Sequence, residues 1–184
     1  MEAYIEESEI DSIYEYNKFD YSDIKYLNPI IKGNGKNIII KNNSDDNIII
    51  STPTVKVHKL LRNRIGDCYL DLNINYNNNN NAKSFLEFIG NIEDLNSDNI
   101  YNNSKEWFNN KQISYDIIDE YKKSSFNITS NGSIIFRVKY NKNDYKHINR
   151  GDTIKLELHI ESIRIMKTRF YTEWIVLNLS KIDL

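Results

Sequence analysis

The sequence predicts an α+β chain that is rich in β-strands and carries a helical insert in its middle. On both sides of the insert, apolar and polar residues alternate, as in residues 69–76 and 153–160, which is the period of a strand with one buried face. Inside the insert, apolar residues recur every three or four positions between Phe85 and Leu95, which is the period of an amphipathic helix. A chain of 184 residues with 40% apolar residues can build one domain around a core.

The first 26 residues are predicted to form an acidic arm, either mobile or folded as a short helix, beside a single domain at residues 27–184. Residues 1–24 hold eight carboxylates against one lysine and show no clean strand or helix period. This N-terminus is acidic where a signal peptide is basic and then apolar, and no run approaches the ~20 apolar residues that span a bilayer. Cys68 has no second cysteine with which to form a disulfide. We therefore expect an intracellular protein that does not act at a membrane.

Two isoleucine runs, at residues 38–40 and 48–50, are separated by a polar, asparagine-rich segment. Two β-branched runs around a polar turn predict a β-hairpin. Pro53 either ends the second strand or places it at a sheet edge, because proline has no backbone N–H to donate. A short strand is expected to follow near residues 55–57, before the longer strand at residues 69–76.

The helical insert is expected at about residues 82–123, in three helices. The first carries the apolar positions from Phe85 to Leu95. Ser97 and Asp98 are candidate caps for a second helix, and Ser114 for a third, because a short polar side chain can accept a hydrogen bond from an unpaired N–H group at the start of a helix.

Strands are predicted again after the insert, at residues 134–140, from Gly151 onward, and at residues 170–179. The apolar positions change parity near Glu161 and Ser162, which predicts a β-bulge that bends the strand. The last strand is apolar on both faces, so both faces are expected to be covered. Strand, helix and strand in this order, with a bent strand, predict an OB-like barrel or a curved antiparallel sheet.

Motifs for catalysis or metal binding do not stand out. The three histidines, at positions 58, 147 and 159, lack the spacing of a zinc site, and Cys68 with His58 has no nucleophile signature around it. Gly33 and Gly35 precede a strand and lack the spacing of a phosphate-binding loop, so they favour a turn. We therefore expect a protein that is not an enzyme, with no catalytic residue, no metal and no cofactor.

The charge distribution points to a polyanionic partner. Residues 121–170 hold eleven Lys or Arg against four carboxylates, in contrast to the acidic N-terminus. Single-stranded nucleic acids are bound by cations that follow the phosphates and by aromatic faces on which bases stack. The residues predicted to do this are Lys56, Lys59, Arg62, Arg64, Tyr69, Arg137, Lys139, Arg164, Lys167, Arg169, Phe170 and Tyr171. The alternative for Phe170 and Trp174 is a place in the core, and for the cations it is ordinary surface charge.

The order of features also resembles that of a known family. A glycine-rich turn is followed by a strand ending at Thr52-Pro53, an amphipathic helix, the sequence Glu106-Trp107-Phe108, a strand opened by Gly151-Asp152, and a closing strand around Trp174. This order, over roughly residues 25–184, is similar to that of single-stranded DNA-binding proteins of nucleocytoplasmic large DNA viruses. The resemblance implies an OB-type core that binds single-stranded DNA during replication in the viral factory, without catalysis.

The functional hypothesis is therefore a non-catalytic protein that binds single-stranded nucleic acid, with DNA favoured, in viral replication in the host cytoplasm or viral factory. The alternative is a structural or scaffolding protein that self-associates or recruits partners, with the acidic arm as a contact for a protein partner. A metal-dependent nuclease is a third possibility, because carboxylates are plentiful. The preference between DNA and RNA, the number of nucleotides covered and the oligomeric state are left open.

Overall fold

The computed structural model describes residues 13–76 and 79–182, which form an α+β fold as predicted. Eleven described strands form one mixed sheet, joined by two α-helices and two short 3-10 helices. The elements are, in chain order, β1 (Ile13–Glu15), η1 (Tyr16–Lys18), η2 (Tyr21–Asp23), β2 (Ile24–Tyr26), β3 (Ile30–Lys32), β4 (Gly35–Asn42), β5 (Ile49–Ser51), β6 (Val55–Arg62), β7 (Cys68–Ile74), α1 (Asn80–Trp107), α2 (Tyr115–Tyr121), β8 (Phe126–Ile128), β9 (Ile134–Tyr140), β10 (Thr153–Met166) and β11 (Arg169–Lys181).

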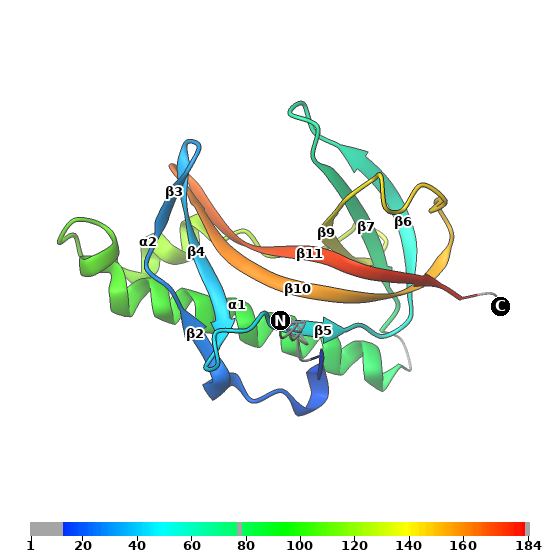
Figure 1. The fold of residues 1–184 in the computed structure, drawn as a ribbon, viewed down its shortest axis with the longest axis horizontal. Helices are drawn as coiled ribbons and strands as arrows, with labels where there is room; N and C mark the ends of the chain where they lie inside the picture. Colours follow the sequence, from blue (N-terminus) through cyan, green and yellow to red (C-terminus); the bar gives the residue numbers. More distant parts are fainter. Residues whose placement is uncertain (1–12, 77–78, 183–184) are drawn as a thin grey trace, which may run out of the picture.

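The β10–β11 hairpin runs through the middle of the molecule as a long curved ribbon (Figure 1). Its two strands pair along their whole length around a two-residue turn at Lys167 and Thr168. The register shifts twice, once at Glu161 on β10 and once at Leu177 on β11. The bulge predicted near Glu161 and Ser162 is therefore confirmed, and the two bulges account for the bend of the ribbon.

The edge of β10 opposite to β11 pairs with three strands, one after another along its length. Residues 162–165 of β10 pair with β4, residues 157–159 pair with β5, and Thr153 and Ile154 pair with β6. The hairpin predicted for the two isoleucine runs is therefore wrong, because β4 and β5 both pair with β10. A strand as long as β10 offers hydrogen-bonding positions to both runs, and the polar segment between them closes on itself through the hydrogen bond from Asn42 N to Asp46 O.

The strands close into a ring. From β10, the ring passes to β11, β9, β7 and β6, and β6 returns to β10. Strands β9 and β11 are parallel and meet at a single pair, Lys139 with Ile175. The sheet is therefore curved, as predicted, but mixed, because the pairing of β1 with β5 is also parallel.

Helix α1 lies below the β10–β11 ribbon, whereas the β3–β4 and β6–β7 hairpins rise above it (Figure 1). The helix and ribbon share an aromatic core in which the Trp174 ring lies edge-on to Phe88 and Phe136. Instead of the two helices predicted around Ser97, the structure has one of 28 residues. The Ser97 hydroxyl donates a hydrogen bond to the Glu93 carbonyl one turn earlier, so Ser97 has a hydrogen-bond partner inside the helix and does not cap a new one. No helix in the described part of the chain is both long enough and apolar enough to cross a membrane.

The described part of the predicted arm, residues 13–26, is folded against α1. Phe19 is buried, and its ring lies edge-on to those of Tyr14 and Phe88. The Tyr26 hydroxyl donates to Asn96 on α1. Burial of aromatic rings therefore decides the conformation of residues 13–26 in spite of their acidic neighbours. Residues 1–12 of the predicted arm lie outside the described residues.

Strand β11 is covered on one face only. Trp174 and Val176 are buried towards α1, whereas Tyr171 and Glu173 are half-buried and Leu177 is 43% exposed. The prediction that both faces of this strand are covered is therefore wrong. The second face instead lines an open groove on the side of the ribbon away from α1.

Gly35 on β4 lies against the backbone of the end of β10. A Cβ atom at this position would clash with the backbone carbonyl of Ile165, which cannot move without disturbing the ribbon. We expect Gly35→Ala to lower the free energy of unfolding by about 1–3 kcal/mol, as overpacking does. Gly90→Ala is the matched control, because nothing lies within 4 Å of a Cβ there and alanine favours a helix. Urea unfolding of both variants tests this expectation, and equal stabilities would contradict it.

Candidate functional site

Strands β9 and β11 diverge from their single pair, and residues 122–128 fill the wedge between them. The Lys123 N–H donates to the Phe170 carbonyl on β11, and the Arg137 N–H on β9 donates to the Ser125 carbonyl. Strand β8 then pairs with β9. The segment therefore connects both strands and provides the base of a hollow between them.

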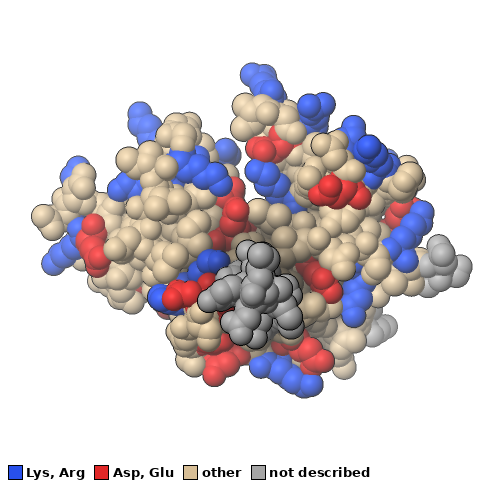
Figure 2. Space-filling view, viewed as in Figure 1, with Lys and Arg blue, Asp and Glu red and all other residues tan. Residues whose placement is uncertain are grey.

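This hollow is a groove of about 500 Å³. We call its base, formed by Ser124, Ser125 and residues 172–174, the floor. Its lining residues are Leu61, Arg62, Asn63, Tyr69, Lys123, Ser124, Ser125, Asn127, Arg137, Lys139, Arg169, Tyr171, Thr172, Glu173 and Trp174. Figure 2 shows this face of the molecule hollowed between two raised parts, with Lys and Arg on both parts and carboxylates between them.

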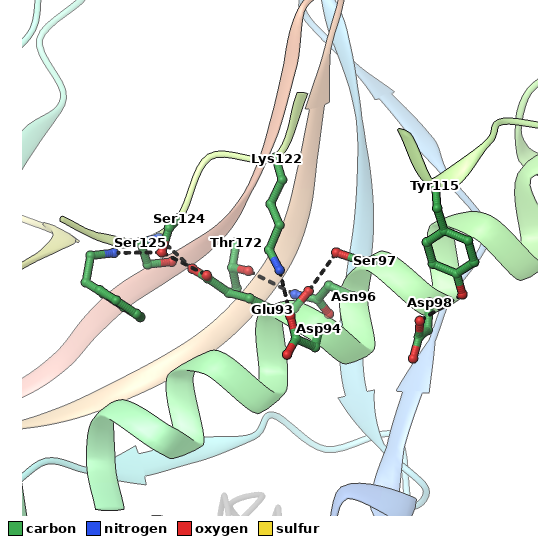
Figure 3. Close-up of polar contacts among 11 residues, drawn as sticks. Glu93, Asp94, Asn96, Ser97, Asp98, Tyr115, Lys122, Ser124, Ser125 and Thr172 are labelled. Carbon is green, nitrogen blue, oxygen red and sulfur yellow. Dashed lines mark hydrogen bonds and ion pairs between the residues drawn. The ribbon is translucent and has the colours of Figure 1, made fainter. Parts of the chain in front are cut away.

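A buried carboxylate on α1 fixes the floor from below. Glu93 accepts hydrogen bonds from the Ser124 hydroxyl at 2.9 Å and from the Ser125 N–H at 2.5 Å (Figure 3). The Ser125 hydroxyl in turn accepts from the indole N–H of Trp174 at 2.8 Å. Because a buried carboxylate must be hydrogen-bonded, these contacts satisfy Glu93 and hold the floor in one conformation.

Two half-buried tyrosines line the groove from different strands. Tyr69 lies on β7 and Tyr171 on β11, and their side chains are close enough to interact electrostatically. Burial raises the pKa of both phenols, with further contributions from the charges of Asp67 and Glu173. The Arg169 guanidinium lies 5.8 Å from the centre of the Tyr171 ring. Both tyrosines are therefore neutral aromatic surfaces at physiological pH.

The cations of the groove fall into two groups. Arg137 makes a bidentate ion pair with Asp71, at 2.6 and 2.9 Å, and Lys139 pairs with Asp67 at 2.9 Å. Within residues 13–76 and 79–182, the exposed side chains of Arg62, Lys123 and Arg169 have no carboxylate partner. We call these three residues the rim. Among the cations that line the groove, these three have charges that no carboxylate of the described residues neutralises, so they are available to an anionic ligand.

The groove brings together half of the residues predicted from the sequence, namely Arg62, Tyr69, Arg137, Lys139, Arg169 and Tyr171. Lys56 and Lys59 on β6, Arg64 on the β6–β7 turn and Lys167 on the β10–β11 turn are exposed outside the groove lining.

Phe170 and Arg164 are also predicted site residues that the structure places elsewhere. Phe170 is 6% exposed and belongs to the core, so it has no free face for a base. Arg164 donates to the Asn37 side-chain carbonyl at 2.6 Å and to the Lys32 carbonyl at 2.7 Å, which uses its guanidinium to join β10 to the β3–β4 hairpin.

Sequence reasoning missed a pair of carboxylates, Glu173 in the floor and Glu161 next to it. Glu173 Oε2 accepts from the Ser162 hydroxyl at 2.9 Å and from the Asn37 amide at 3.3 Å. Burial raises the pKa of the Glu161 carboxyl, and the charge of Glu173 and a hydrogen bond with it raise that pKa further. The bulge, which was visible in the sequence, is the feature that places Glu161 beside Glu173. Lys123 was also missed, because its position suggested only the end of a helix.

The structure gives no sign of a metal centre in the part of the chain that it describes, where no three His, Cys, Asp or Glu side chains form a metal-binding group. No protein-family model matches the chain, and a search of curated proteins finds no match.

The raised pKa of the Glu161 carboxyl implies that the free energy of unfolding depends on pH. Because its pKa is raised by folding, its favourable contribution is present at low pH and is lost as the pH rises through the folded-state value. We expect Glu161→Gln to melt at a higher temperature than the unmodified protein at pH 7.5, since glutamine stays neutral, with about 2–4 °C gained for each 1 kcal/mol in a chain of this size. The difference should shrink towards pH 4. Thermal melts across this range provide the measurement, and a difference independent of pH would contradict the expectation.

Proposed function

We propose that this protein binds single-stranded nucleic acid, with DNA favoured, in the groove between β9 and β11 and without catalysis. The observation that carries this proposal is the combination of two half-buried tyrosines, Tyr69 and Tyr171, with a rim of three cations that have no carboxylate partner in the described residues. Aromatic faces and free cations around one groove are the two components that a sequence-tolerant single-strand binder requires.

The tyrosines favour a single strand over a duplex. Stacking a base on an aromatic side chain contributes about 1–3 kcal/mol, but it requires a base that is exposed and unpaired. A duplex presents its phosphates to the protein and keeps its bases stacked on each other. Half-buried rings that line a groove can stack on unpaired bases that enter it, which supports a single-stranded ligand.

The rim supplies the electrostatic part of the binding. Each phosphate neutralised on a single strand makes the logarithm of the binding constant fall by about 0.7 per tenfold increase in salt. Three contacts, from Arg62, Lys123 and Arg169, therefore predict a total slope of about −2. Arg137 and Lys139 are neutralised by Asp71 and Asp67, so we assign them to the architecture of the groove wall and not to the phosphates.

The biological setting is a further part of the proposal. The order of features that resembles single-stranded DNA-binding proteins of large DNA viruses supports a role in viral DNA replication, in the host cytoplasm or viral factory. In that role the protein would coat single-stranded DNA and could act as a homo-oligomer. A contact between the acidic N-terminal residues and a protein partner belongs to the same proposal and is motivated by their charge.

Fluorescence polarisation with a labelled oligonucleotide across a salt series tests the proposed site. We expect binding that weakens with salt at a slope of about −2 and that becomes weaker by roughly tenfold or more in Arg62→Glu/Arg169→Glu, because two phosphate contacts become repulsive. The matched control is Lys83→Glu/Lys105→Glu, which makes the same change in net charge on exposed positions of α1. It should bind almost as well as the unmodified protein.

Four results would overturn the proposal. The first is the absence of binding at low salt, and the second is an equal loss in the two double variants, which would mean that only net charge matters. The third is a defined oligomer in light scattering whose mass ignores added oligonucleotide, which would support a scaffolding protein. The fourth is cleavage of the oligonucleotide in the presence of Mg²⁺ or Mn²⁺, which would show a nuclease.

A further inference from the structure

Glu173 is the one carboxylate among the lining residues of the groove, and it lies between two walls that carry cations. It follows Tyr171 by two positions on β11, so the two side chains lie on the same face of the strand. Its position is fixed by a chain of hydrogen bonds in which Arg164 holds Asn37, and Asn37 and Ser162 both donate to Glu173 Oε2. The carboxylate is therefore preorganised and does not rotate freely.

Glu173 keeps capacity to accept another hydrogen bond. An ionised carboxylate has about four acceptor positions. Asn37 and Ser162 occupy two of them, and the hydrogen bond with Glu161 occupies a third. Burial and the nearby Glu173 raise the pKa of the Glu161 carboxyl and so favour its neutral form in the folded protein. At least one acceptor position remains for a ligand.

This arrangement determines how a strand can lie in the groove. A phosphate placed over Glu173 would meet a fixed negative charge in a partly desolvated site, which is unfavourable. The rim cations Arg62, Lys123 and Arg169 offer the phosphates a favourable path at the outer edge. The bases must then point inward, towards the tyrosines and Glu173.

We infer, on the basis of the proposed function, that Glu173 accepts a hydrogen bond from the amino group of an inward-pointing base and so makes the groove prefer cytosine over thymine. Cytosine presents its N4 amino group where thymine presents the O4 carbonyl. The amino group donates to the carboxylate, whereas the carbonyl oxygen and the carboxylate are both acceptors and repel each other. The two pyrimidines otherwise stack on tyrosine over similar areas, so the preference depends on this one group.

The test compares labelled oligo-dC and oligo-dT of equal length by fluorescence polarisation at pH 7.5. We expect the unmodified protein to bind oligo-dC about tenfold more tightly, which is the effect of one well-placed hydrogen bond to a base edge. In Glu173→Gln the ratio should fall towards one, because glutamine can both donate and accept. The salt slope should not change, since the phosphate contacts remain.

Glu157→Gln is the matched control, because Glu157 lies on the same ribbon outside the groove lining, and it should keep the full preference for oligo-dC. Equal binding of the two oligonucleotides, or a preference that survives Glu173→Gln, would overturn the inference and leave the proposed function standing. Failure to bind either oligonucleotide would overturn both. A loss of affinity for both oligonucleotides with the ratio unchanged would show that Glu173 is structural and would also overturn the inference.

Discussion

The carboxylate of Glu93 stabilises the arrangement on which the candidate site depends. Strands β9 and β11 share one pair and then separate, and the ring of strands stays connected past that point through residues 122–128. Glu93 holds this segment through Ser124 and Ser125, while Trp174 donates to Ser125 from β11. A buried carboxylate is tolerated only where donors surround it, so the helix, the segment and the strand must fit together. Their fit produces a groove where β9 and β11 separate.

The charges of the groove are separated by depth, and this separation explains its proposed chemistry. Arg137 and Lys139 lie on the wall and are paired with Asp71 and Asp67, whereas the rim cations are exposed. Glu173 is half-buried at the floor and is held by hydrogen bonds from Asn37 and Ser162. A uniformly basic groove would attract any polyanion and could hold it in many orientations. An acidic floor under a basic rim instead favours ligands that are anionic on one side and carry hydrogen-bond donors on the other, as a single strand of nucleic acid does.

Local patterns in the sequence predicted the periods of β7, β9 and β10, the first half of α1 and the bulge at Glu161, because each depends on residues close together in the chain. Pairing could not be predicted in the same way. The isoleucine runs pair with β10 more than 100 residues away, and the choice between that partner and each other depends on the whole sheet. The same limit applies to the site. Arg137 looked free because Asp71, which neutralises it, is 66 residues away. Phe170 and Tyr171 are adjacent aromatic residues on opposite faces of β11, and only the fold shows which face is buried.

The central claim is that Tyr69 and Tyr171 contact the bases of a bound single strand. Ultraviolet cross-linking with an oligonucleotide that carries halogenated uracil, followed by mass spectrometry of the peptides, tests this contact directly. The account predicts cross-links to Tyr69 and Tyr171, and none to the exposed Tyr76 and Tyr115. Cross-links confined to Tyr76, Tyr115 or other residues outside the groove lining would contradict it.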